Sequence, residues 1–315
     1  MDWHGVAMTP LPGGHSGETF LVGEGTEDEA VVRIYARHPE RCVVDASLLR
    51  LLYGVLPVPR VLDERPPVLG QPGVLVVQRL PGRRLDLILS RAGDAEWATV
   101  GQHLGEALGI LSGIPQLRFG LFCDADLTPS AQHVDVNGAV GWARRFRAAG
   151  RLAGWPDDDF DRLLALAGEA DDRLLGATAS GQDDQQRTGV ARVVLVHSDF
   201  NPKNILVDPD TLQVTGVLDW EFAHAGYPVT DLGNLLRFER HPVFVAAVLD
   251  AYRSRVPNAG PDLLGRARAA DLYALIELAD RQGQNPVADR AHDLLLHMAR
   301  TGDLHATPTA APTAQ

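Results

Sequence analysis

The densest group of side chains suited to chemistry lies between residues 196 and 221. Asp199 is followed five positions later by Asn204, and Asp219 comes after a second short apolar run. A Pro-Asp turn separates the two apolar runs, so the chain is expected to form a hairpin that brings Asn204 and Asp219 to the same end. A carboxylate that acts as a base, together with an amide oxygen and a second carboxylate as hard ligands, suits Mg²⁺ and a phosphoryl donor.

The amino-acid sequence of this segment resembles that of the aminoglycoside phosphotransferase family. It reads HSDFNPKN at 197–204, LDWE at 218–221 and DLGNLL at 231–236. An HxDxxxxN pattern followed by a hairpin and an aspartate is the catalytic arrangement of the protein-kinase-like fold. The HRD, DFG and APE forms of protein kinases are missing, which favours a kinase of small molecules. The resemblance covers roughly residues 8–300.

The resemblance implies a role for each polar residue of the segment. Asp199 would be the catalytic base, and Asn204 and Asp219 would hold Mg²⁺. His197 would brace the catalytic loop, and Asp231 would support it from the following helix. Each of these residues alone also suits ordinary turn chemistry. Their common spacing favours the catalytic interpretation.

Lys203 is the only lysine in the chain, and it falls inside the predicted catalytic loop. As a point charge beside the path of the transferred group, it could help to neutralise the phosphate. A solvated loop lysine is the alternative. The scarcity of lysine elsewhere makes its place here a reason to include it among the catalytic candidates.

A glycine-rich turn near the N-terminus is the first candidate for nucleotide binding. Gly14, His15 and Ser16 lie in the sequence LPGGHSGETF, which leads into an apolar strand. Successive backbone N–H groups in such a turn can approach phosphate oxygens closely. Turns of this kind are also common where nothing binds, so these residues depend on the rest of the pattern for their interpretation.

Further nucleotide-binding candidates follow from their place in the resemblance. Arg33, in the run AVVRIY, stands where kinases carry the phosphate-binding lysine, and its planar guanidinium can contact phosphate through two hydrogen bonds. Asp45 stands where the family has a helix glutamate that pairs with this cation. Aspartate is one methylene shorter, so direct pairing requires a closer helix. The backbone from Gln78 to Leu80 is where adenine would be bound.

The elements that must position these residues fall into two groups. Up to about residue 80, short β-branched runs alternate with turns, with one helical pattern at 43–53. Beyond it, helical spacing dominates at 96–112, 139–152, 157–176 and 231–299. With the resemblance, this predicts an α+β protein of bilobal protein-kinase-like fold. Its parts would be a small β-rich N-lobe over 1–80, a larger helical C-lobe over 81–302 and a disordered tail over 303–315.

Charge and composition narrow the choice of partners. The 315 residues include 29 Lys and Arg against 41 Asp and Glu, a formal net charge of −12. Such a surface repels nucleic-acid backbones and anionic membranes, and it favours a cationic small molecule. The 2 cysteines exclude a disulfide framework. No apolar run reaches the ~18 residues of a membrane span, and the first residues lack a signal-peptide pattern, so a cytoplasmic location is expected.

These observations predict an O-phosphotransferase that uses ATP (or GTP) and Mg²⁺ and acts on a hydroxyl of a small cationic molecule. By the resemblance, an antibiotic of the aminoglycoside or basic peptide type is the leading acceptor, with a role in resistance, and the enzyme is a monomer or homodimer. Two alternatives stay open: a kinase of a primary metabolite of the choline, homoserine or fructosamine type, and a catalytically silent nucleotide-binding regulator. Glu221, Glu239 and Asp280 are acidic candidates for the acceptor pocket, whereas Trp220 and Phe222 are expected to pack the loop.

Overall fold

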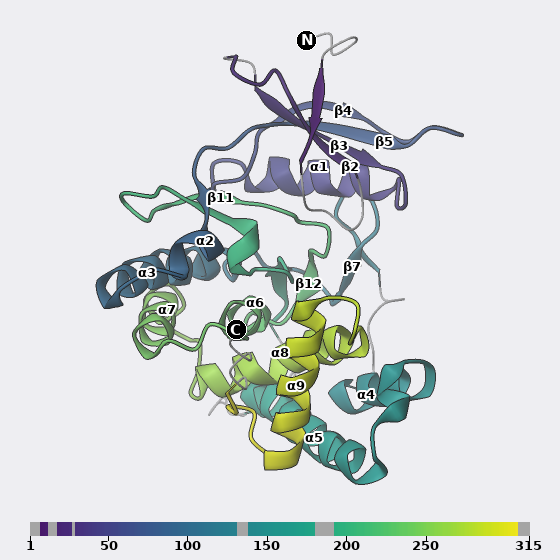
Figure 1. Cartoon of the computed structure of the whole chain (residues 1–315), viewed down its shortest axis with the longest axis vertical. Helices are drawn as coiled ribbons and strands as arrows, with labels where there is room; N and C mark the ends of the chain where they lie inside the picture. The colour runs from purple at the N-terminus through teal and green to yellow at the C-terminus, as the bar shows by residue number, and fades with distance from the viewer. Residues whose placement is uncertain (1–6, 12–17, 27–28, 131–137, 180–191, 308–315) are drawn as a thin grey trace, which may run out of the picture.

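The computed structural model describes residues 7–11, 18–26, 29–130, 138–179 and 192–307. The N-terminal part is a five-stranded antiparallel sheet in the order β1-β2-β3-β5-β4, and helix α1 packs beneath it (Figure 1). The elements are β1 (Met8–Pro10), β2 (Glu18–Val22), β3 (Ala30–Tyr35), α1 (Arg41–Leu52), β4 (Val61–Arg65) and β5 (Gly73–Gln78).

Alternation along the central strands gives the sheet two buried faces. Val32 and Val76 belong to a small apolar cluster on one face, whereas Tyr35 and Leu75 join the main core together with residues of α1. Arg33 is the cross-strand partner of Leu75, so its side chain emerges on the face covered by α1. That face looks toward the helical part of the molecule (Figure 1), and the strand pattern therefore directs this cation toward the rest of the chain.

The C-terminal part is mainly helical, with two small sheets at its junction with the first part (Figure 1). One of them joins β6 to the hairpin of β10 and β11, and the other has the order β8-β7-β12-β9. The strands are β6 (Arg83–Arg84), β7 (Gly120–Phe122), β8 (Pro129–Ser130), β9 (Val194–Val196), β10 (Ile205–Val207), β11 (Val214–Val217) and β12 (His224–Gly226). The helices are α2 (Leu85–Leu89), α3 (Asp94–Leu111), α4 (Gly138–Ala149), α5 (Asp157–Ala179), α6 (Thr230–Leu236), α7 (Pro242–Arg255), α8 (Leu263–Asp280) and α9 (Pro286–Thr301).

The connection between the two parts is fastened to the β10–β11 hairpin. Gly82 has a φ of +115°, and a Cβ at this position would lie 2.3 Å from Oγ1 of Thr215 and 2.9 Å from the carbonyl oxygen of Val207. The same Thr215 hydroxyl donates to the carbonyl oxygen of Pro81 at 2.7 Å. Only glycine suits this backbone angle and this closeness. The contacts hold Pro81 and Gly82 against the C-terminal part, and the division of the chain near residue 80 stays a proposal.

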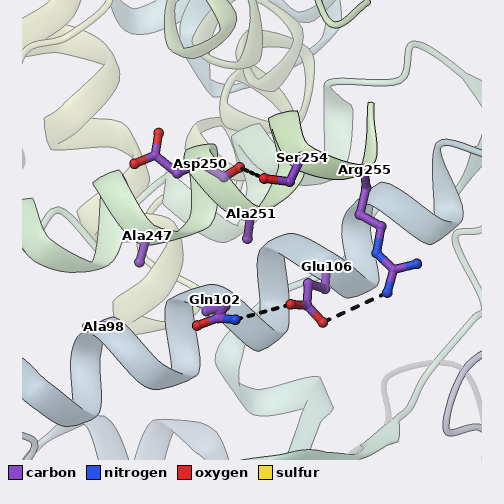
Figure 2. A pocket seen from close by; sticks show the side chains of 8 residues that line it. All are labelled: Ala98, Gln102, Glu106, Ala247, Asp250, Ala251, Ser254 and Arg255. Carbon is purple, nitrogen blue, oxygen red and sulfur yellow. Dashed lines mark hydrogen bonds and ion pairs between the residues drawn. The ribbon is translucent and has the colours of Figure 1, made fainter. Parts of the chain in front are cut away.

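Helices α3 and α7 pack through a row of glycines. Gly101, Gly105 and Gly109 lie one turn apart on α3, and at Gly105 a Cβ would lie only 2.3 Å from the carbonyl oxygen of Val248. Ala247 and Ala251 of α7 face this row (Figure 2). Beside it, the two helices border a groove of about 420 Å³ that contains none of the predicted site residues. The row lets the helix backbones approach closely.

Gly105→Ala is expected to destabilise the protein by about 1–3 kcal/mol, because the added methyl must displace helix backbone. Gly168, inside α5, is the matched control, since a Cβ there meets nothing within 4 Å. Gly168→Ala is therefore expected to stabilise by about 0.5–1 kcal/mol through helix propensity alone. Denaturant unfolding of both variants measures the difference. Equal effects of the two substitutions would contradict close packing at Gly105.

Most of the predicted elements are present, and the differences have local causes. The helical pattern predicted over 139–152 ends at Ala149, because Gly150 adopts an extended conformation and residues 151–154 form a 3₁₀ turn. The helical pattern predicted over 157–176 continues further, since α5 ends at Ala179. The strands β7, β8 and β12 were not predicted, because two or three residues are too few to show a period of two.

The predicted tail begins in an ordered turn. Leu304 and Ala306 are buried against the core, and residues 308–315 lie outside the described part of the chain. Across the described ranges, every helix is too short or too polar to cross a membrane.

Candidate active site

One buried carboxylate holds the predicted catalytic loop where it leaves β9. The two oxygens of Asp231, in the first turn of α6, accept the backbone N–H groups of His197 and Ser198, each at 2.8 Å. Burial raises the pKa of the Asp231 carboxyl, although these two amides oppose the shift. Ser198 has a φ of +69°, a left-handed conformation that costs a non-glycine residue about 1 kcal/mol. The two hydrogen bonds stabilise the loop in this strained form.

His197 is fully buried and links the loop to the hairpin. Its Nε2 lies 2.9 Å from the carbonyl oxygen of Leu218, and its Nδ1 lies 3.2 Å from the backbone nitrogen of Asp199. A carbonyl oxygen can only accept and an amide N–H can only donate, so the ring carries its proton on Nε2. The ring also packs against Phe200 and Trp220. These contacts support the bracing role proposed for His197.

Both oxygens of the Asp199 carboxylate accept hydrogen bonds from amides of its own loop. Nδ2 of Asn201 lies 2.6 Å from Oδ1, and Nδ2 of Asn204 lies 2.7 Å from Oδ2. The carboxylate is therefore oriented while its remaining lone pairs can still accept a hydrogen bond from a hydroxyl. Asn201 was not predicted as a site residue. The Asn-Pro pair that starts the turn at 201–202 was its only signal.

The hairpin predicted between Asn204 and Asp219 is present. Ile205 of β10 pairs with Val217 of β11, and the backbone N–H of Leu218 donates to the carbonyl oxygen of Asn204 at 2.8 Å. Asp219 follows with a φ of +63°. This strained turn carries its carboxylate out of the hairpin to the junction between the sheet and the helical part, where the side chain is 28% exposed.

Arg33 reaches this junction from β3. Its Nη1 lies 3.0 Å from Oδ1 of Asp219, and its Nη2 lies 2.5 Å from Oε2 of Glu221. Burial lowers the pKa of the guanidinium, but the neighbouring Tyr35 hydroxyl and the surrounding carboxylates raise it above its ordinary value. Arg33 therefore stays charged. Burial, followed by repulsion from Asp219, raises the pKa of Glu221 to about 7.

The pairing considered for Arg33 and Asp45 exists only as a long contact. Nη1 of Arg33 lies 3.9 Å from Oδ2 of Asp45, whereas the Tyr35 hydroxyl donates to the same oxygen at 2.7 Å. Nη2 of Arg41, one turn earlier on α1, lies 3.3 Å from the other oxygen and 3.4 Å from the carbonyl oxygen of Trp220. Burial raises the pKa of Asp45. Its main partners were not foreseen from the sequence.

The remaining nucleotide candidates are less closely tied to this centre. Gly14, His15 and Ser16 lie outside the described residues. Gln78 ends β5, exposed, with its backbone N–H bonded to the carbonyl oxygen of Arg60 at 2.9 Å.

Leu80 and Lys203 complete the set. Leu80 is half-buried against the hairpin, where a Cβ at Gly216 would lie 3.1 Å from its Cδ1. Lys203 is exposed in the 3₁₀ turn η3 (Pro202–Asn204) of the loop, and the structure describes no ion pair for it. Both remain proposals, Leu80 for the base and Lys203 for the phosphate.

Two oxygen donors near the junction, from Asn204 and Asp219, could serve as metal ligands. Across the described ranges, no cluster of three or more His, Cys, Asp or Glu side chains could hold a metal ion. The Asn204 amide directs its nitrogen to Asp199, which leaves its oxygen on the other side of the planar group, and Asp219 adds a carboxylate. Mg²⁺ bound with nucleotide needs only one or two carboxylates, because waters and phosphates supply the rest. The residues present fit such an ion.

The acidic candidates for the acceptor pocket lie apart. Glu221 contacts Arg33, Glu239 is half-buried just after α6 with its pKa raised by burial, and Asp280 lies against Gly150, whose Cβ position would be 1.9 Å from Oδ1. Trp220 is buried, as expected of a packing residue. Phe222 is 46% exposed, so the prediction that it packs the loop is wrong.

A sheet with one helix stands beside a helical part whose β10–β11 hairpin presents Asn204 and Asp219, which is the arrangement of a kinase-like fold. The chain matches the model of the phosphotransferase enzyme family (APH) over residues 7–272. It belongs to this family, and it is an enzyme of the phosphotransferase class with an α+β fold.

The chain is also similar to two proteins of known name, one of which is a phosphotransferase. An aminoglycoside 3'-phosphotransferase of Streptomyces fradiae is 28% identical over 228 residues, 69% of this chain and 73% of that protein. A shorter match, 46% identical over 48 residues, covers 15% of this chain and 6% of the acyl-CoA dehydrogenase family member 11 of Mus musculus. The chain thus spans only a small part of that relative.

Solved structures show the same fold. The GDP complex of aminoglycoside 2'-phosphotransferase-IIIa has a TM-score of 0.66 at 15% identity, covering 94% of this chain and 93% of that one. A thermostable mutant of aminoglycoside phosphotransferase APH(4)-Ia, in a ternary complex with AMP-PNP and hygromycin B, has a TM-score of 0.59 at 19% identity, with 94% of each chain covered.

Proposed function

We propose that this enzyme transfers the γ-phosphoryl group of ATP, or GTP, to a hydroxyl of a small cationic molecule, with Mg²⁺ as cofactor. The observation that carries the proposal is the Asp199 carboxylate, oriented by Asn201 and Asn204 next to the hairpin that presents Asp219. Related structures that hold AMP-PNP or GDP support a nucleotide as the donor.

The residues divide the work of the transfer. Asp199 would accept a hydrogen bond from the acceptor hydroxyl and orient its oxygen toward the γ-phosphorus. Arg33 would hold the α- and β-phosphates through its guanidinium. Asn204 and Asp219 would hold Mg²⁺, which when bound neutralises charge on the phosphates. Asp231 and His197 keep the loop in shape without touching the reacting atoms.

The acceptor we propose is an antibiotic of the aminoglycoside or basic peptide type. The names of the Streptomyces fradiae relative and the hygromycin B complex support this class, and so does the net charge of −12. Phosphorylation would then protect the cell from the antibiotic, and the site would work in the cytoplasm. A metabolite kinase would use the same residues for the transfer and differ only in the acceptor pocket.

The test is incubation of the purified protein with ATP, Mg²⁺ and a panel of aminoglycosides, basic peptide antibiotics and amino alcohols. Mass spectrometry should reveal a gain of about 80 daltons on one class of acceptor, the mass of a transferred phosphoryl group. A gain on an amino alcohol alone would assign a metabolite kinase. No gain on any acceptor, together with firm nucleotide binding, would assign a silent regulator and contradict the proposal.

A further inference from the structure

Arg33 faces three carboxylates, one on α1 and two in the segment that follows β11, and the nearest is not on the helix that carries this partner in the related kinases. Glu221, which follows the β10–β11 hairpin, approaches to 2.5 Å, and Asp219 approaches to 3.0 Å. Asp45 on α1 stays at 3.9 Å. The order of distances places the principal partner of Arg33 in the C-terminal part of the chain.

Asp45 is engaged elsewhere, which explains its distance. Its two oxygens accept from the Tyr35 hydroxyl and the Arg41 guanidinium. Arg41 also donates to the carbonyl oxygens of Phe122 and Trp220. The carboxylate of Asp45 therefore orders α1 against the helical part, and it has little left with which to aim Arg33.

Asp219 and Glu221 differ in their exposure and in their proposed roles. Asp219 is the more exposed of the two, with 28% of its side chain accessible, and it is the carboxylate proposed to hold Mg²⁺. A metal ion held by Asp219 would compete with Arg33 for that carboxylate. Glu221 is 7% exposed and can keep its contact with Nη2 while the phosphates approach Nη1.

We infer that Glu221 is the positioning residue for Arg33. It takes the role that a glutamate on the helix has in the family, at the position of Asp45 in this chain. The inference rests on the proposed function, because Arg33 binds phosphate only if the protein binds nucleotide. The contact spans the two parts of the molecule, since Arg33 lies on β3 and Glu221 follows β11. Glu221 can therefore orient the Arg33 guanidinium only while β3 and the segment after β11 are in contact.

The test is the affinity for ADP without metal, measured by calorimetry in EDTA at pH 8. Glu221→Gln is expected to raise the Kd of ADP about tenfold, because a buried charge-assisted contact is lost. The same change in an Arg33→Ala background is expected to add nothing further. Glu64→Gln is the matched control. It breaks a carboxylate–guanidinium contact of 2.6 Å to Arg50 on the N-terminal part and should leave the Kd within about twofold.

Each other outcome decides the matter. Unchanged or tighter binding of ADP by Glu221→Gln would overturn the inference, and so would an unchanged metal-free affinity with a raised Mg²⁺ requirement, which makes Glu221 a metal ligand. A further loss in the Arg33→Ala background would also overturn it. Thermal unfolding checks that Glu221→Gln folds. If it does not, Glu221→Asp replaces it, with an intermediate loss expected because the charge remains on a shorter side chain.

The proposed function fails separately. If the unchanged protein binds neither ADP nor ATP, nucleotide-dependent transfer is refuted and the role of Glu221 falls with it. If the unchanged protein binds ADP and Glu221→Gln matches it, only the role assigned to Glu221 is refuted.

Discussion

Asp199→Asn is expected to lower the rate of phosphoryl transfer about a thousandfold, because an amide cannot accept the acceptor proton as a carboxylate does. The binding of nucleotide should change little, since the partners described for the carboxylate are amides of its own loop. Steady-state kinetics with the acceptor found in the panel, together with calorimetry of ADP binding, measure the two effects. A variant that kept more than about a tenth of the turnover would contradict the role of Asp199.

The substitution also disturbs the loop, so it needs a control that keeps the carboxylate. In Asp199→Asn, one amide would face another across a contact of 2.6 or 2.7 Å. Asn201→Ala removes one of these contacts and leaves Asp199 intact. It is expected to lower the rate only about tenfold. If Asn201→Ala were as damaging as Asp199→Asn, loop order would explain the loss and the carboxylate would have no chemical role of its own.

Asp231→Ala is expected to lower the free energy of unfolding by about 2–4 kcal/mol, because two buried backbone N–H groups lose their acceptors. Turnover should fall as well, since Ser198 would no longer be held in its left-handed conformation. Urea unfolding and kinetics on the same preparation measure both. Asp231→Asn keeps one acceptor oxygen, so its free energy of unfolding should fall between those of Asp231→Ala and the unchanged protein.

An acidic side chain on the surface provides the comparison. Asp250 on α7 is 79% exposed and makes one ion pair with Arg253. Asp250→Ala is therefore expected to change stability by less than about 0.5 kcal/mol. If Asp231→Ala were equally mild, the Asp231 carboxylate would not be what holds the catalytic loop.

The sequence was most informative where local spacing determines geometry. Asn204 and Asp219 flank two short apolar runs with a Pro-Asp turn between them, and such a pattern has one simple solution, a hairpin with both residues at the same end. The bracing of the loop by Asp231 could be predicted only through the resemblance, because 34 residues separate it from the backbone N–H of His197. No local pattern reports a hydrogen bond of that kind.

The partners of Arg33 show where prediction from sequence stops. Glu221 lies 188 positions away, and which of several acids meets the guanidinium depends on how the sheet settles on the helical part. Asp45 was the natural expectation from family position. The Asp45 carboxylate instead accepts hydrogen bonds from Tyr35 and Arg41. Neither of these residues belongs to a recognisable motif. The exposed Phe222 is a second case, since apolar character predicted packing and only the fold reveals exposure.

The segment that joins the sheet to the helical part is held at one end. The Thr215 hydroxyl donates to the carbonyl oxygen of Pro81, and Gly82 lies against Thr215 and the backbone of Val207. The residues from Gln78 to Leu80, proposed to bind the base, run directly from the end of β5 to this fastened point. The same short stretch of chain therefore connects the two parts of the molecule and carries the proposed contact with the base.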